Sequence, residues 1–152
     1  MPVRRQTERG NETPYIRHFA VFLPNRVGQL NELLAGLDEV GVEIAGISMV
    51  DSSDWVVVRM VFADVGKARE MLTRRGVAFT ESDALAVVLA EGQTIAQMCK
   101  PLVVAELNLF YAFALLIRFE NQPVLVLRVD DHLVAAQVLA KHGFTLLDYE
   151  DL

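Results

Sequence analysis

The residues best suited to bind a small anion lie in one loop, Leu23-Pro24-Asn25-Arg26-Val27-Gly28-Gln29-Leu30. This loop follows a short apolar run at 19–23 and leads into a helical pattern that begins at Leu30. A strand that turns directly into a helix presents free backbone N–H groups and the positive end of the helix dipole, and both favour a carboxylate. The alternative is structural: Asn25 caps the helix and Gly28 eases a tight turn. The loop alone leaves both interpretations open, although most loops of this kind bind nothing.

The other reactive residue types do not form a catalytic or metal-binding pattern. Three histidines, His18, His132 and His142, are scattered along the chain without a metal spacing. Cys99 falls on the apolar face of a helical pattern, where a thiol is usually an inert part of the core. The acidic residues at 148–151 are interpreted as a solvated tail. We therefore expect no enzyme activity, no metal and no cofactor.

Length, charge and composition exclude several classes of protein. The chain has 152 residues, enough for one ordinary domain or two small ones. Its net charge of −6 argues against nucleic acid as a partner. No apolar run reaches the roughly 20 residues that span a bilayer, and residues 1–14 have no apolar core of a signal peptide and are expected to form a disordered lead-in. With a single cysteine, the sequence predicts a cytoplasmic protein that binds no membrane.

The hydrophobic pattern predicts the element order strand, helix, strand, strand, helix, strand. Alternating residues at 55–62 place Val56, Val58, Met60 and Phe62 on one apolar face, which we expect the helices to cover. Two helices on one face of an antiparallel sheet make a ferredoxin-like βαββαβ unit of the α+β class. The expected strands are 16–23, 44–51, 55–62 and one within 77–89, and the expected helices are 26–40 and 64–76.

The second half of the sequence repeats this pattern. Alignment of Leu30 with Ile95 keeps an apolar quartet in place, and alignment of Gly76 with Gly143 also sets Asp64 on Asp131. Agreement of helix periodicity, helix starts and helix ends indicates an internal duplication. We expect two units, at 15–83 and 84–152. The quartet is Leu30, Leu33, Leu34 and Leu37, which becomes Ile95, Met98, Cys99 and Leu102.

The two copies differ at the loop. When Leu30 is aligned with Ile95, the polar, basic and glycine residues of the first loop are replaced in the second copy by residues that suit an anion poorly. Gly92 could take the place of the glycine if the alignment slips by one residue. The first copy is therefore the expected binding unit. The substituted pairs are Asn25 and Ala90, Arg26 and Glu91, and Gly28 and Gln93.

The second copy also carries two irregular features. Pro101 falls inside its first helix, where proline removes a hydrogen bond and predicts a kink or an early end. The segment 107–117 is apolar on both faces, as in a strand that is covered on both sides. Together with Val57 and Val61, it leaves more apolar surface than one two-layer unit can hide. This surplus predicts a homodimer or a larger even oligomer.

The loop and the helix after it resemble the ACT domain family. The resemblance rests on Pro-Asn-Arg-x-Gly-x-Leu after the first strand and on a helix that closes with Gly-Val-Glu-Ile. With the duplication, residues 15–152 resemble a tandem ACT protein without a catalytic domain, the second domain being degenerate at the loop. The matching residues are Asn25, Arg26, Gly28, Leu30, Gly41, Val42, Glu43 and Ile44.

The resemblance implies regulatory binding of a small molecule, most often an amino acid, at an interface between ACT units. In such domains the first loop and helix start hold the carboxylate, and backbone groups of the second strand from a neighbouring unit hold the ammonium. The ligand would act on a partner enzyme, for which an amino-acid biosynthetic enzyme is a candidate, or on the protein's own assembly. The implied site residues are Asn25, Arg26, Val27, Gly28, Gln29, Leu30, Ile47, Ser48 and Met49.

Three other functions fit the expected topology. A structural module could keep the fold for oligomerisation without binding a ligand, and this is the main alternative. RNA recognition through the sheet is disfavoured by the negative charge and by the lack of an aromatic-basic pattern at 55–62. An acylphosphatase-like enzyme would need a glycine-rich first loop, whereas this loop has a single glycine, Gly28.

Overall fold

The structure is a computed structural model of the chain, and it describes residues 14–152. The expected lead-in at 1–14 lies, except for its last residue, outside the described residues. Two compact units account for the fold: Arg17–Ser82, and residues 14–16 together with Asp83–Leu152. Among the described helices, none is both long and apolar enough to cross a membrane.

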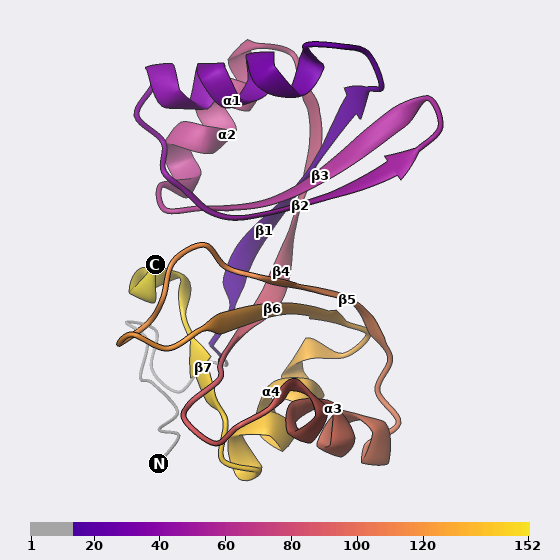
Figure 1. The fold of residues 1–152 in the computed structure, drawn as a ribbon, viewed down its shortest axis with the longest axis vertical. Coiled ribbons are helices and arrows are strands. Elements are labelled where there is room, and N and C mark those ends of the chain that lie inside the picture. Colours follow the sequence, from indigo (N-terminus) through magenta and orange to yellow (C-terminus); the bar gives the residue numbers. More distant parts are fainter. Residues whose placement is uncertain (1–13) are drawn as a thin grey trace. The chain divides into compact units, whose positions relative to one another are not determined.

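The first unit has the predicted ferredoxin-like topology. Its strands lie in the order β2-β3-β1-β4, with β3 antiparallel to both β1 and β2. Helices α1 and α2 cover one face of this sheet (Figure 1). The elements are β1 (Ile16–Pro24), α1 (Gln29–Glu39), β2 (Ile44–Ser52), β3 (Trp55–Phe62), α2 (Val65–Arg74) and the beginning of β4 (Ala78–Val88).

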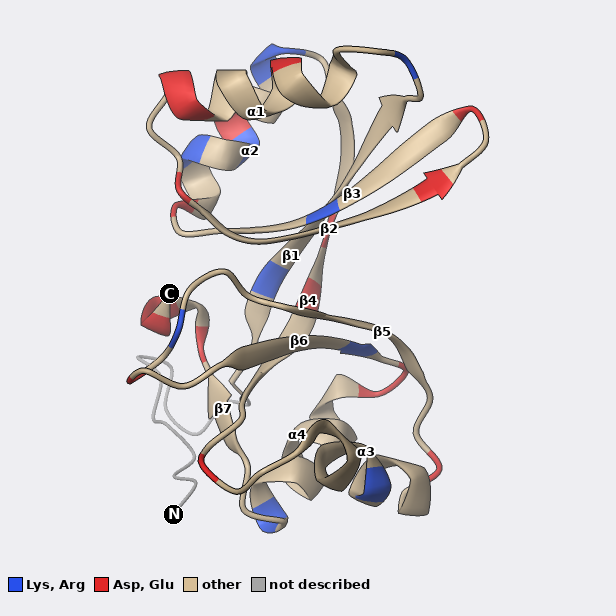
Figure 2. Ribbon diagram, viewed as in Figure 1, with Lys and Arg blue, Asp and Glu red and all other residues tan. Residues whose placement is uncertain are grey.

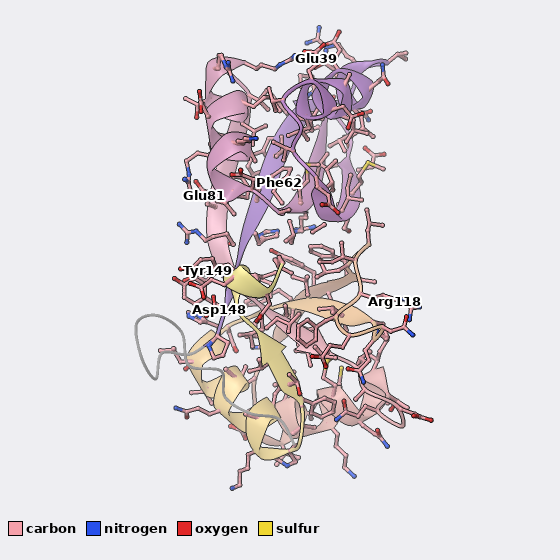
Figure 3. The ribbon with its side chains drawn as sticks, turned by 90° about the vertical axis from the view of Figure 1, so that its left-hand side faces the viewer. Glu39, Phe62, Glu81, Arg118, Asp148 and Tyr149 are labelled. Atoms are coloured by element: carbon pink, nitrogen blue, oxygen red, sulfur yellow. The ribbon has the colours of Figure 1, made fainter. Side chains whose placement is uncertain are left out.

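The core of the first unit lies between this sheet and its two helices. Val58, Met60 and Phe62 of β3 are buried there, and Val56 packs against them, so the predicted apolar face is confirmed. The Phe62 ring, labelled in Figure 3, meets the Phe19 ring edge to face at a centroid distance of 5.1 Å.

The second unit repeats the topology of the first. Its strand order is β5-β6-β4, with β7 on the other side of β4. Strand β4 therefore ends the first unit and begins the second. The remaining elements are α3 (Ile95–Val104), β5 (Leu109–Ala114), β6 (Val124–Val129), α4 (His132–Lys141), β7 (Thr145–Leu147) and the short 3-10 helix η1 (Tyr149–Asp151).

The structure supports the duplication down to the register of the strands. Strand β2 has a bulge between Ile44 and Gly46, and β5 has one at the equivalent place, between Leu109 and Tyr111. After the bulge, Met49 pairs with Val58 in the first unit, and Ala114 pairs with Leu125 in the second. The alignment of the two halves that was inferred from the sequence therefore relates equivalent positions.

Helix α3 does not end early at Pro101, which was one of the two outcomes expected there. It continues past Pro101 to Val104, and the Pro101 carbonyl accepts a hydrogen bond from the Ala105 N–H at 3.1 Å. The helix does not end early because proline removes only its own N–H donor, while its carbonyl still serves the last turn.

Strand β5 contradicts one expectation. It lies at the edge of the sheet of its unit, and of its six residues only Phe113 is buried. The interpretation of 107–117 as a strand covered on both faces was wrong, because apolar residues on an edge strand can also remain at the surface.

The acidic C-terminus is ordered, contrary to its interpretation as a solvated tail. Asp148 is buried, and its N–H donates to the Asp151 carboxylate at 2.8 Å. The next residue, Tyr149, donates its N–H to the Tyr15 carbonyl at 3.0 Å. Figure 3 shows Asp148 and Tyr149 beside each other at this end of the chain.

Candidate functional site

The loop between β1 and α1 turns through a left-handed glycine. Gly28 has a φ of +89° and is the N-cap residue of α1, so the helix begins at Gln29 rather than at residue 26 as expected. Within the loop the Arg26 N–H donates to the Pro24 carbonyl at 2.8 Å. Most side chains would be strained at this φ, which explains the glycine.

Asn25 does not cap the helix. Its side-chain Nδ2 donates to Asp51 Oδ1 at 3.1 Å and to the Ser53 carbonyl at 2.9 Å. Its backbone N–H donates to the Asp54 carbonyl at 2.8 Å. The capping interpretation was therefore wrong, and Asn25 instead fastens the loop to the β2–β3 hairpin.

Helix α1 begins without a side-chain cap. Its N-cap is a glycine, and in the described part of the chain the N–H groups of Leu30 and Asn31 have no hydrogen-bond partner. The other three described α-helices are capped by Asp64, Thr94 and Asp131, each of which accepts a first-turn N–H. Among these four helices, only α1 lacks a side-chain acceptor for the N–H of its third residue, and the dipole there favours an anion.

A depression of about 460 Å³ lies against this helix start. We call it the loop depression. Its walls combine apolar side chains with one base, Arg26, and one acid, Asp51. Figure 2 shows a basic segment on the loop between β1 and α1 and acidic segments on the β2–β3 hairpin. The lining residues are Leu23, Pro24, Asn25, Arg26, Gln29, Leu30, Met49, Asp51 and Val56.

The loop depression brings together five of the nine residues expected from the sequence: Asn25, Arg26, Gln29, Leu30 and Met49. The other four lie nearby but do not line it. Val27 is fully exposed on the loop, Gly28 precedes the helix, Ile47 packs against the core, and Ser48 is half-buried on β2.

Sequence reasoning did not name Asp51, the last residue of the expected strand 44–51, as a site residue. Asp51 lies two residues after Met49 on β2, and the period of a strand puts both on one face. That spacing was the available signal, but nothing in the pattern indicated that this face would meet the loop.

A second depression, of about 480 Å³, adjoins the first and shares Leu23, Pro24 and Gln29 with it. It extends to Trp55 and to the connection between α2 and β4 at Gly76. In the second unit the equivalent gap is bridged by a side chain. Gln93, which replaces Gly28, accepts from the Ala90 N–H at 2.9 Å and donates to the Gly143 carbonyl at 3.0 Å. The loop of the first unit is open where that of the second is closed.

Two of the residues first considered for catalysis or metal binding, His142 and Cys99, make structural contacts. His142 bonds through Nδ1 to the Val138 carbonyl at 2.8 Å, at the end of α4. Cys99 packs against the core of the second unit. Within residues 14–152, no group of three or more metal-ligand side chains gathers in one place.

The fold and the loop define the class of this protein. The family described as the ACT domain pair matches residues 15–152, so the chain belongs to that family. The resemblance inferred from the loop motif and the duplication is confirmed. ACT domains are regulatory ligand-binding units, and a regulatory role follows from membership.

Solved structures share the fold. A protein from Bacteroides thetaiotaomicron gives a TM-score of 0.81 at 19% identity, covering 90% of this chain and 94% of its own. The ligand-free regulatory subunit of aspartate kinase from Thermus thermophilus gives 0.57 at 12% identity, with 87% and 94% covered. The regulatory subunit of aspartate kinase from Thermus flavus gives a TM-score of 0.55 at 15% identity, covering 86% of this chain and 94% of its own. The comparison with curated proteins gives no match.

Proposed function

We propose that this protein binds an α-amino acid in the loop depression of the first unit and transmits its presence as a regulatory signal. The observation that carries the proposal is the open start of α1 beside Arg26. Gln29 and Leu30 at the start of α1 line the depression together with Arg26, and free N–H groups, a helix dipole and a guanidinium all favour a carboxylate. The family supports the regulatory role.

The second unit is a natural comparison for this proposal. At the position of Arg26 it has Glu91, whose charge repels a carboxylate, and α3 begins at a Thr94 cap that already uses a first-turn N–H. Gln93 fills its loop with internal hydrogen bonds. We therefore propose one amino acid per chain, bound by the first unit.

The first test is a thermal-shift screen of the twenty amino acids, followed by calorimetric titration of the best ligand. Ligand at a hundred times its Kd should stabilise the fold by about 2.7 kcal/mol, which is several degrees at roughly 2–4 °C per kcal/mol. Arg26→Glu copies the second unit at an exposed position and should weaken binding at least tenfold. Lys100→Glu makes an equal charge change at an exposed position of α3. It is the matched control and should leave Kd unchanged.

Two results would contradict the proposal. One is two equal sites per chain, which would remove the distinction between the loops. The other is an absence of binding by all twenty amino acids at millimolar concentration.

The partner on which the signal acts is proposed to be an enzyme of amino-acid biosynthesis. Two of the solved structures that share the fold are described as regulatory subunits of an enzyme, aspartate kinase, and this supports an enzyme as the partner. Cytoplasmic location stays a prediction of the sequence alone.

A structural module that oligomerises without ligand is the second candidate function. The apolar edge strand β5 favours it, since Phe110 and Leu116 at this edge are 60% and 67% exposed. Such a surface suits a second copy of the chain, and the homodimer expected from the sequence is proposed to use it.

A further inference from the structure

We infer that the amino acid bound in the loop depression has an uncharged aliphatic or thioether side chain, of leucine or methionine type, and that Asp51 binds its ammonium group. This inference rests on the proposed function and names the ligand class and a further binding residue.

The walls of the loop depression provide one partner for each charge of a zwitterion and none for a third. Arg26 and Asp51 are the charged residues among those that line it. If the α-carboxylate takes Arg26 and the α-ammonium takes Asp51, a charged ligand side chain would find no counter-charge. Removing such a side chain from water without a partner is costly.

The remaining wall is apolar. Leu23 is buried, Leu30 and Val56 are half-buried, and Met49 is 54% exposed, so all four offer apolar surface to a ligand. Burial of a leucine-sized side chain against such a wall is worth roughly 1.5–3 kcal/mol when complete. The volume of about 460 Å³ lies within the roughly 300–1,000 Å³ typical of small-molecule sites.

Asp51 is held in an orientation that leaves one oxygen available. Asn25 Nδ2 donates to Oδ1 at 3.1 Å, and in the described residues Oδ2 has no hydrogen-bond partner. A carboxylate fixed through one oxygen can accept from an ammonium through the other. Asn25 is then a positioning residue, because it orders both the loop and the acid.

The second unit has lost this charge pair. The shared bulge and register place Leu116 at the position of Asp51, and Glu91 stands at that of Arg26. Ala114 replaces Met49 and Ala90 replaces Asn25. Loss of both charges and of the orienting amide in one copy indicates that they act together in the other.

The test compares ligands on the unaltered protein. Leucine, isoleucine and methionine should each bind at least tenfold more tightly than aspartate or lysine in calorimetric titration. N-acetyl-leucine lacks the ammonium and leucinamide lacks the carboxylate, so each should bind at least tenfold more weakly than leucine.

Two variants test Asp51 directly. Asp51→Asn should weaken leucine binding at least tenfold while leaving the weak binding of N-acetyl-leucine unchanged, because that ligand has no ammonium to lose. Asp54→Asn changes an exposed carboxylate in the same hairpin that does not line the depression, and it should leave both affinities unchanged. Both positions are exposed, and thermal unfolding checks that each variant is folded.

The outcomes separate this inference from the proposed function. If aspartate or lysine binds most tightly and Arg26→Glu abolishes that binding, the amino-acid site stands and the apolar ligand class is wrong. If leucine binds but Asp51→Asn has no effect, the role of Asp51 is wrong. If no amino acid binds, the proposed function fails and this inference fails with it.

Discussion

Asn25 bonds to the hairpin rather than to the helix because of its distance along the chain. A capping side chain reaches the second or third N–H of a helix from the residue just before it. Helix α1 begins at Gln29, four residues after Asn25, and the left-handed Gly28 takes the capping position. The Asp51 carboxylate and the Ser53 carbonyl are within reach instead. The residue named as a cap therefore organises the wall of the candidate site.

Glu81 gives a prediction of pH dependence. Both of its oxygens accept hydrogen bonds from Arg69 at 2.7 Å, with Arg17 Nε 3.6 Å away, and these cations lower the pKa of Glu81 from its ordinary 4.5. Figure 3 labels Glu81 in the first unit. A lowered folded-state pKa contributes stability above the unfolded-state pKa, and this is lost as pH falls through the folded value.

We therefore expect Glu81→Gln to lower the free energy of unfolding at pH 7 but to have little effect at pH 2. Urea denaturation at both pH values measures the difference. Glu70→Gln, an exposed acid on α2, is the control and should have little effect at either pH. Equal destabilisation at both pH values would show that the loss comes from packing rather than from charge.

At the scale of the element, the ends of α1 and α3 differ by one substitution. Both helices close with the same hydrogen bond, from Val42 N–H to the Leu37 carbonyl and from Leu107 N–H to the Leu102 carbonyl. The left-handed residue is Gly41 in α1, but it is Glu106, at a φ of +58°, in α3. That conformation costs a residue with a side chain roughly 1–2 kcal/mol.

Replacing Glu106 by glycine should therefore stabilise the chain by up to about 1 kcal/mol, after the greater entropy of glycine in the unfolded state is deducted. The reciprocal change, Gly41→Ala, should destabilise it by a similar amount. Chemical denaturation of both variants provides the check. A destabilised Glu106→Gly would mean that the glutamate side chain makes contacts worth more than the strain.

The boundaries of the elements show which parts of the fold the sequence could predict. Strand β3 lies where alternation at Trp55–Phe62 placed it, since a strand with one buried face has a period of two. The start of α1 was three residues early, because apolar periodicity does not locate a left-handed residue. The contacts of Asn25 with Asp51 and of Gln93 with Gly143 join segments 26 and 50 residues apart. Such contacts depend on how the elements pack, which a single sequence does not specify.

At the scale of the molecule, strand β5 gives a prediction of assembly. Its six residues lie at a sheet edge, and Leu109, Phe110 and nearby Leu116 are exposed. We expect a homodimer in solution, and Phe110→Lys, which places a charge on that edge, should raise the dimer dissociation constant at least tenfold. Light scattering over a range of concentrations measures the dissociation constant. Val103→Lys, at an exposed position of α3, is the control. A wild-type mass of 16.9 kDa throughout the micromolar range would rule out the dimer.

The missing cap of α1 also affects how the chain can carry a signal. A helix whose first N–H groups lack a side-chain cap frays more readily than a capped one, so we expect the first turn of α1 to open more easily than those of α2, α3 and α4. A carboxylate that accepts those hydrogens ends the fraying and orders the segment. We expect such a ligand to change the distribution of local unfolding, and a change in conformational entropy is itself a coupling free energy. An uncapped helix is thus a means by which a small unit can respond to what it binds.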